Sequence, residues 1–424
     1  MKIQCAGLFL LMATAALGAE APAVSTGTLT LKDALAMAQK ENPEILAARK
    51  KWDAARARIS QAGTPDKPRL DIERMYAPRG ENIISKAEEK NIAVTQELPF
   101  PSTLYLKSRL AKKEAQMAEA AFRSKERSVL SRVKSAYAML YWSHHALHVF
   151  EENTDLMRRF SKVAEARYAS GKASQGEVLK AQVELSKMQN MLISLDQERE
   201  TNQAMLNTLL NRDPQTPLGP PEEPASPSMK EDLRELQTQA LKTRPDLKEA
   251  ALSVERSGTA VGIARSDYLP DLMLQYRQRD MMNGVDSQDA IIGFSVPLWF
   301  WKQGAMVKEA KADREMAQAE LQTMKNMTLY DVKNLFVKVQ TTQRLIDLYQ
   351  TSVIPQAEEA LKVAEAGYQS DKLNFLDLLD ASRSLLNFRL EHYQHITDYE
   401  IALAELERAV GSDLRLATAS KEAQ

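Results

Sequence analysis

The segment Arg167-Tyr168-Ala169-Ser170-Gly171-Lys172 decides the fold, because a matching segment, Gly367-Tyr368-Gln369-Ser370-Asp371-Lys372, returns 200 residues later. Each segment separates two long stretches in which glycine and proline are rare, so each predicts a turn between two long helices. The residues after the two turns also correspond, since Glu177-Val178-Leu179-Lys180-Ala181 matches Asp377-Leu378-Leu379-Asp380-Ala381. The chain therefore contains one helical hairpin twice.

The duplication extends along the whole chain. Asn42-Pro43-Glu44 returns as Arg244-Pro245-Asp246 after 202 residues, and Leu98-Pro99-Phe100 returns as Val296-Pro297-Leu298 after 198. A repeat of this length must be recognised before any prediction of the fold. The expected organisation is a signal peptide 1–19, a first repeat 20–212, a proline-rich linker 213–230, a second repeat 231–413 and a C-terminal tail 414–424.

Each repeat predicts the same order of elements. A helix near 30–63 or 231–266 restarts at Pro43 or Pro245, where proline suits a first helical turn. Two short stretches of alternating apolar and polar residues follow, separated by a polar loop at 77–91 or 279–289, which is the pattern of a β-hairpin.

Very long helices follow each hairpin. We expect helices over 103–169 and 303–370, the second kinked near Pro355, and returning helices over 173–212 and 373–411. At 1.5 Å per residue the longest would span roughly 100 Å. Apolar residues in 173–212 alternate at spacings of three and four, as in a coiled coil. The fold class is thus mainly α with a small β part.

The N-terminus and the composition indicate an exported protein. Lys2 followed by the apolar run 6–17 and small residues near Gly18 predicts a secretory signal peptide. The sole cysteine, Cys5, lies inside it, so the mature chain has no disulfide and no cysteine-based metal site. The formal net charge of −1 gives no electrostatic reason to expect nucleic acid.

The strands and helices together predict a membrane duct. Two β-hairpins cannot close a conducting barrel alone, and lipid does not tolerate open sheet edges. Several chains would therefore pool their strands into one barrel, with the helices packed side by side as a tube. The alternative is a soluble coiled-coil scaffold whose hairpins cap the helices.

The chain resembles the TolC family of outer-membrane efflux proteins over nearly its whole mature length. The resemblance is carried by the duplicated element order, by Pro99 and Pro297 at the strand exits, and by the tyrosine-to-alanine motif at both helical turns. It implies a homotrimer with a duplicated helical hairpin tube, four strands per chain in one outer-membrane barrel, and a passive efflux duct. It also implies a periplasmic adaptor and an inner-membrane pump, with the RND type as one candidate, as partners.

The resemblance also assigns roles to particular residues. The two helical turns would contact the adaptor through Arg167, Tyr168, Ser170, Gly171, Lys172, Tyr368, Ser370, Asp371 and Lys372. Asp377 and Asp380 share a helix face and would form an acidic gate, the alternative being a solvated helix start favoured by the helix dipole. Trp299, Phe300 and Trp301 would form the periplasmic-side aromatic girdle, the alternative being local packing.

Other functions have less support. His144 and His148 are one helical turn apart, but solvated helix histidines are the favoured reading, because no carboxylate or cysteine completes a metal site. No nucleophile elbow, phosphate loop or dinucleotide fingerprint occurs, so no enzyme activity and no cofactor is expected. A periplasmic coiled-coil adaptor is the other alternative, although adaptors have one helical hairpin and more strand.

Overall fold

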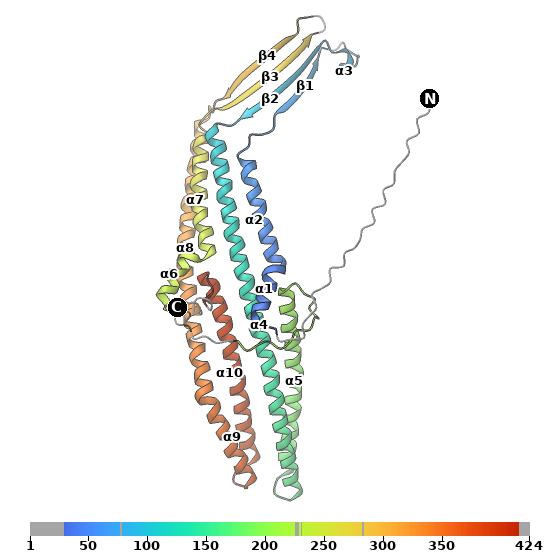
Figure 1. The fold of residues 1–424 in the computed structure, drawn as a ribbon, viewed down its shortest axis with the longest axis vertical. Helices are drawn as coiled ribbons and strands as arrows, with labels where there is room; N and C mark the ends of the chain where they lie inside the picture. Colours follow the sequence, from blue (N-terminus) through green and yellow to red (C-terminus); the bar gives the residue numbers. More distant parts are fainter. Residues whose placement is uncertain (1–28, 77–78, 225–228, 230, 282–283, 415–424) are drawn as a thin grey trace, which may run out of the picture.

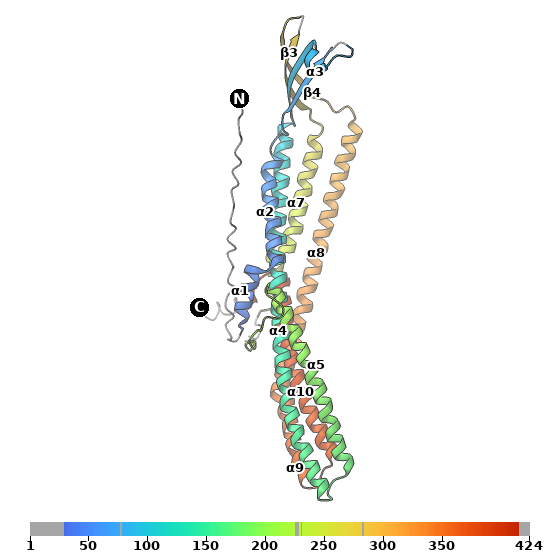
Figure 2. The same ribbon diagram turned by 90° about the vertical axis from the view of Figure 1, so that its right-hand side faces the viewer.

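The computed structural model describes residues 29–76, 79–224, 229, 231–281 and 284–414. The expected signal peptide and nearly all of the expected tail lie outside these residues. The molecule is a long rod with a small sheet at one end and two helical turns at the other (Figure 1). The helices run nearly parallel to the long axis in both views (Figure 2).

The first repeat contains the elements in the predicted order. They are α1 (Leu31–Glu41), α2 (Pro43–Ala62), β1 (Arg69–Met75), a short α3 (Ile83–Lys86), β2 (Glu89–Leu98), α4 (Pro101–Ala169) and α5 (Gln175–Leu209). Helix α4 runs unbroken for 69 residues. Asn42 separates α1 from α2, and its side chain accepts hydrogen bonds from the first backbone amides of α2.

The second repeat has the same order with two differences among the described residues: no helix lies between its strands, and its long helix is divided by a π-helical turn. Its elements are α6 (Leu233–Thr243), α7 (Pro245–Ser266), β3 (Asp271–Met281), β4 (Ser287–Ser295), α8 (Phe300–Leu348), the π-helix η1 (Tyr349–Val353), α9 (Ile354–Gln369) and α10 (Phe375–Val410). The kink expected near Pro355 is a π-helical turn just before it. Proline cannot donate a backbone hydrogen bond, so the turn before it takes the wider π-helical form.

The four strands form one antiparallel sheet in the order β1-β2-β3-β4. The joint between the two repeats is the pair β2–β3, in which Leu98 lies opposite Leu272 and Glu89 opposite Met281. Strands β1 and β4 are the two edges. The strands extend into the expected polar loops: β2 begins at Glu89 and β3 ends at Met281. Ion pairs from Arg279 to the neighbouring strands accompany the backbone hydrogen bonds there.

The helices continue the same lateral order as the strands. In the half near the sheet, α2 packs on α4, α4 on α7 and α7 on α8; in the other half, α5 packs on α4, α4 on α10 and α10 on α9. One edge of the rod therefore consists of β1, α2 and α5, and the opposite edge consists of β4, α8 and α9 (Figure 1).

The buried core is distributed along the rod in separate clusters. One joins α1 and α2 to α4 around Val129, Tyr137 and Leu140, and another joins α6 to α8 and α10 around Val332 and Leu406. A third holds the two hairpins together near the turns, around Met157 and Phe375. This distribution fits a wall one helix thick rather than a globular domain.

Part of the linker crosses the middle of the rod. Pro221 pairs with Leu29 in a parallel bridge. The buried Tyr137 hydroxyl donates to the Leu29 carbonyl at 2.8 Å and accepts from the Glu222 amide at 2.8 Å. The linker and the chain entering α1 are thus held to α4 at one point.

Candidate functional site

The sheet has one apolar face and one polar face. Even-numbered residues of each strand lie on the same face in the observed register, and these side chains are exposed and mostly apolar. They include Leu70, Ile72, Ile92, Val94, Leu274, Tyr276, Ile292 and Phe294. An exposed apolar face of this extent marks a membrane or partner surface.

Charged and amide side chains fill the other face. Arg279 contacts Glu89 at 3.4 Å and Asp289 at 3.1 Å, from the two strands that flank β3. Two rows further along the same face, the Gln275 amide donates to the Thr95 hydroxyl at 2.9 Å. Apolar side chains outward and polar side chains inward are the pattern of a transmembrane barrel strand.

The three aromatic residues after β4 are exposed. Trp299, Phe300 and Trp301 expose 61%, 60% and 72% of their surface. The rings of Trp299 and Trp301 contact each other, with centroids 5.3 Å apart. These side chains lie at the sheet end of α8, and none of them belongs to the buried core.

The two helical turns lie side by side and have the same backbone. Gly171 has φ of 74° and Asp371 has φ of 63°, and each places a left-handed residue after its helix. The Lys172 amide donates to the Arg167 carbonyl at 2.8 Å, and the Lys372 amide donates to the Gly367 carbonyl at 2.9 Å. Aspartate tolerates the left-handed region better than most residues, so Asp371 replaces glycine without changing the turn.

Arg167 connects the two turns. Its guanidinium donates to the Tyr368 carbonyl and to the Asp371 carboxylate, and it lies 4.4 Å from the centroid of the Tyr368 ring. The Tyr368 hydroxyl donates to Glu177 at 3.1 Å. Burial, together with this bond, raises the pKa of Tyr368 to about 12, so Tyr368 remains a donor at neutral pH. We call Arg167, Glu177, Tyr368 and Asp371 the tip network.

A second link lies further along the hairpins. Arg383 on α10 donates from Nε to Glu184 on α5 at 2.9 Å, and from its Nη2 to the second carboxylate oxygen. The hydrogen bond from Arg383 holds the pKa of Glu184 below its usual value. The sequence analysis missed this pair, because the two residues are far apart in sequence and neither belongs to a motif.

The two candidate gate residues differ in their surroundings. Asp377 completes a capping box with Asn374, whose backbone amide donates to the Asp377 carboxylate at 3.1 Å. Asp380 has a side chain that is 74% exposed and lies 3.8 Å from Arg383. Asp377 thus has a role in starting α10, whereas Asp380 is the freer carboxylate at this end of the rod.

The histidines lie at mid-length, between α4 and α10. His145 stacks on Tyr393 with centroids 4.6 Å apart, and burial lowers the pKa of His145 and of His392. His148 lies 3.4 Å from Glu152, a carboxylate that the sequence analysis did not count. Among the described residues, no group of three or more histidine, cysteine or acidic side chains is arranged to hold a metal ion.

In the part of the chain that the structure describes, no helix is both long enough and apolar enough to cross a membrane.

Comparisons with known proteins agree over the full length of the fold. The profile of the family described as "Outer membrane efflux protein" matches residues 34–212 and 236–412. The cobalt-zinc-cadmium resistance protein CzcC of Cupriavidus metallidurans is 24% identical, and the alignment covers 92% of each chain. The crystal structure of the outer membrane protein VceC from Vibrio cholerae has a TM-score of 0.77 at 19% identity, covering 91% of this chain and 96% of that one.

The fold and the two-faced sheet define a class of protein, the outer-membrane channels whose helices extend into the periplasm. The chain belongs to the outer membrane efflux protein family. It is the outer-membrane channel component of an efflux system, and the adaptor and scaffold alternatives are thereby excluded. The protein lies in the outer membrane and extends into the periplasm.

Proposed function

We propose that three copies of this chain form one channel, in which their twelve strands close a single barrel and their helices form one tube. The observation that carries the proposal is the sheet, which has an exposed apolar face, a polar face and two unpaired edge strands. Lipid does not tolerate such edges, so the sheet needs further copies. The assembled channel would be a passive duct that catalyses no reaction.

The aromatic residues after β4 would mark one membrane boundary. Trp299, Phe300 and Trp301 follow the strand end that leads into the helical tube, and all three are exposed. Tryptophan side chains favour the zone between lipid and water. We assign them to the periplasmic-side girdle of the barrel.

The helical turns would bind a periplasmic adaptor, which in turn connects the channel to an inner-membrane pump, with the RND type as the candidate. Among the residues that the structure describes, the two turns present the only chain reversals at the far end of the rod. Their exposed residues Ser170 and Ser370 are the positions from which a crosslinker should capture the adaptor. Capture only from positions near the strands would reverse the proposed orientation.

The periplasmic end would be gated by charge and by the links between hairpins. In a trimer Asp380 and Asp377 would place six carboxylates around the mouth, which would attract cations. The tip network and the Arg383–Glu184 pair would hold the two hairpins of each chain in the closed arrangement. Opening would require these contacts to break.

The cargo class that we propose is divalent metal cations. The relative CzcC is named for cobalt, zinc and cadmium resistance, and an acidic mouth suits positively charged cargo. Deleting the gene should lower tolerance to these metals if the proposal is right. Unchanged metal tolerance together with lost tolerance to organic compounds would overturn the metal proposal and leave the channel intact.

The channel itself is tested by mass and conductance. Native mass spectrometry in detergent should give three times the mass of the mature chain, and the purified protein should conduct in planar lipid bilayers. A stable monomer in detergent-free solution would contradict the trimeric barrel.

A further inference from the structure

Charged residues lie at only one end of the sheet's apolar face. On the four strands, all of which the structure describes, this face consists of the even-numbered residues, and the charged ones among them are Arg74, Lys90 and Asp280. All three lie in the row farthest from the helices, where Arg74 is opposite Lys90 and Lys90 is opposite Asp280. This row ends the apolar band at the tip of the sheet, next to α3 (Figure 1).

We propose that Arg74 and Lys90, the cationic rim, bind the phosphate groups of lipid A, the glycolipid of the outer leaflet. The proposal rests on the proposed barrel, in which the apolar face of the sheet meets lipid, and it adds the class of lipid and the residues that recognise it. Lipid A carries phosphates and acyl chains on one sugar core, so it can meet a pair of cations and an apolar surface together.

The length of the apolar band places the cationic rim at the lipid headgroups. Strand β2 is 10 residues long, with Lys90 near one end and Leu98 at the other. At about 3.3 Å per residue it is roughly 33 Å long. A tilt of about 40° reduces its height to roughly 25 Å, the height of the apolar band in outer-membrane barrels. Trp299 and Trp301 follow the opposite end of the band. The aromatic girdle and the cationic rim would thus occupy the two membrane boundaries, with the rim on the outer one.

The two cations of the rim need an anion from outside the chain. Like charges directly opposite each other destabilise an antiparallel pair. Both side chains are exposed, and in the part of the chain that the structure describes neither has a carboxylate within ion-pair distance. Asp280, the carboxylate of the same row, accepts a hydrogen bond from the Gln278 amide at 3.4 Å instead. A phosphate between Arg74 and Lys90 would remove the repulsion.

Helix α3 adds apolar surface beside the rim. The Arg74 guanidinium donates to the Ile84 carbonyl, which holds α3 against the end of β1. Ile83 and Ile84 expose 52% and 66% of their surfaces. The remaining N–H groups of Arg74 lie in one plane, a geometry that suits phosphate oxygens. A phosphorylated lipid fits this arrangement, because its phosphates can meet the cations while its acyl chains meet the isoleucines and the apolar face.

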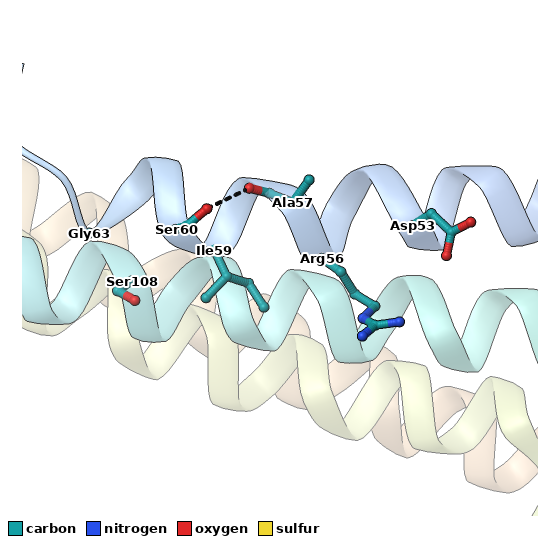
Figure 3. A pocket seen from close by; sticks show the side chains of 7 residues that line it. All are labelled: Asp53, Arg56, Ala57, Ile59, Ser60, Gly63 and Ser108. Atoms are coloured by element: carbon teal, nitrogen blue, oxygen red, sulfur yellow. Dashed lines mark hydrogen bonds between the residues drawn. The ribbon is translucent and has the colours of Figure 1, made fainter.

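A hollow on the helical part of the rod lacks this charge pattern. It lies on α2, and the residues that line it include Asp53, Arg56 and Ser60 of α2 and Ser108 of α4 (Figure 3). Both charges there have partners, since Asp53 binds Lys50 at 3.3 Å and Arg56 lies 5.6 Å from the centroid of the Trp52 ring. An anion in the hollow would meet a carboxylate as well as a cation, whereas the rim presents two cations side by side.

Native mass spectrometry of the detergent-solubilised protein tests the site, with diphosphoryl lipid A as the added ligand. The parent should retain lipid A on the trimer. Arg74→Gln with Lys90→Gln should weaken its binding roughly 30-fold, and Lys90→Gln alone about fivefold, because each cation close to an anionic lipid surface contributes about fivefold. Arg74→Lys keeps the charge and should bind better than the double variant. Monophosphoryl lipid A should bind more weakly than the diphosphoryl form.

Two controls separate lipid recognition from a structural role. Lys302, an exposed cation in the first turn of α8 at the opposite boundary, offers the matched change, and Lys302→Gln should bind lipid A as the parent does. The melting temperature gives the second readout, because added lipid A should raise it more for the parent than for Lys90→Gln. Without lipid A, Lys90→Gln should melt at the parent's temperature or above it, since the repulsion with Arg74 is gone.

The outcomes distinguish the lipid site from the channel. Equal weakening by Lys302→Gln, or phosphatidylglycerol bound to the parent as tightly as diphosphoryl lipid A, would overturn the assignment of the rim to lipid A. A trimeric parent that retains no lipid A, or whose lipid A binding survives the loss of both cations, would do the same while the channel stands. A monomeric mass for the parent protein would overturn the proposed trimer itself.

Discussion

Arg383 on α10 holds both carboxylate oxygens of Glu184 on α5, with Nε donating at 2.9 Å. The pair joins the two helical hairpins of one chain in the half of the rod that ends at the helical turns. Glu184 is largely buried, whereas the Arg383 side chain is 40% exposed. A two-pronged contact of a guanidinium and a carboxylate is both strong and directional, so it fixes how the hairpins lie against each other.

Replacing the carboxylate should weaken this end of the rod in a pH-dependent manner. Glu184→Gln should cost about 1–2 kcal/mol at pH 7, the lower part of the range for charged hydrogen bonds, because Arg383 is partly exposed. The hydrogen bond from Arg383 lowers the pKa of Glu184 from its ordinary value of 4.5. The stabilisation is therefore complete above pH 4.5 and is lost as the pH falls through the lowered pKa.

Thermal unfolding at pH 7, 5 and 3 measures this dependence. The parent and Glu184→Gln should differ equally at pH 7 and 5, and the difference should shrink at pH 3. Lys187, which lies 3.7 Å from Glu184, offers a control, since Lys187→Ala removes an exposed and weak contact. A difference between parent and variant that persists undiminished at pH 3 would contradict the assignment.

The left-handed backbone at the first turn predicts that two glycine-to-alanine substitutions will differ in their effect on stability. Gly171 has φ of 74°, so Gly171→Ala should cost roughly 1–2 kcal/mol. Gly176 lies in the first turn of α5, and an added methyl group there meets nothing closer than the Ser174 hydroxyl at 3.6 Å. Gly176→Ala should therefore be neutral or stabilise by up to about 1 kcal/mol. Melting temperatures that fall equally for both would contradict the turn geometry.

The tip network predicts a channel that opens more readily without Arg167. Arg167→Ala removes both hydrogen bonds to the second hairpin and the contact with the Tyr368 ring. The mean single-channel conductance in planar bilayers should rise, because fewer contacts hold the hairpins together. Arg167→Lys, which keeps the charge but loses the planar two-pronged contact, should lie between the parent and Arg167→Ala. Equal conductance of the parent and the two variants would exclude a role for Arg167 in holding the channel closed.

Much of the fold could be predicted from the sequence because the duplication repeats each signal. Pro43 and Pro245 mark the restarts of two helices, and the two prolines after the strands mark the start of the long helices. A pattern seen twice, at offsets that differ by only a few residues, is far less ambiguous than one seen once. The strand ends were harder to predict, since charged residues such as Arg279 and Glu89 pair across the sheet and extend the ladder into apparent loops.

The contacts between hairpins could not be predicted from the sequence. Contact of Arg167 with an adaptor stays a prediction, whereas its bond to the second turn became visible only in the structure. Glu184 and Arg383 lie on different helices at positions that carry no motif, and they meet only because α5 and α10 both pack on α4. The capping role of Asp377 was visible in principle, because Asn374 precedes it by three residues.

The acidic pair predicts the ion preference of the periplasmic mouth. Asp377→Asn with Asp380→Asn should reduce cation selectivity and weaken block by multivalent cations, since six carboxylates in a trimer would be removed. The structure makes Asp380→Asn the cleaner change, because Asp377 also caps α10 and its loss would loosen the helix start. Asp347→Asn, an exposed acidic residue on α8 away from the turns, is a suitable control.

Selectivity separates a charge in the pore from a charge that only affects opening. Neutralising Asp380 could widen the mouth, by freeing Arg383 from its 3.8 Å contact, or narrow it, by removing repulsion between subunits. Conductance could change in either direction, whereas the reversal potential in a salt gradient depends on the charge that lines the path. It should shift toward zero for Asp380→Asn and stay at the parent value for Asp347→Asn. If Asp380→Asn and the double variant both keep the parent's reversal potential and its block by multivalent cations, the two aspartates do not line the mouth, and their role is confined to the start of α10.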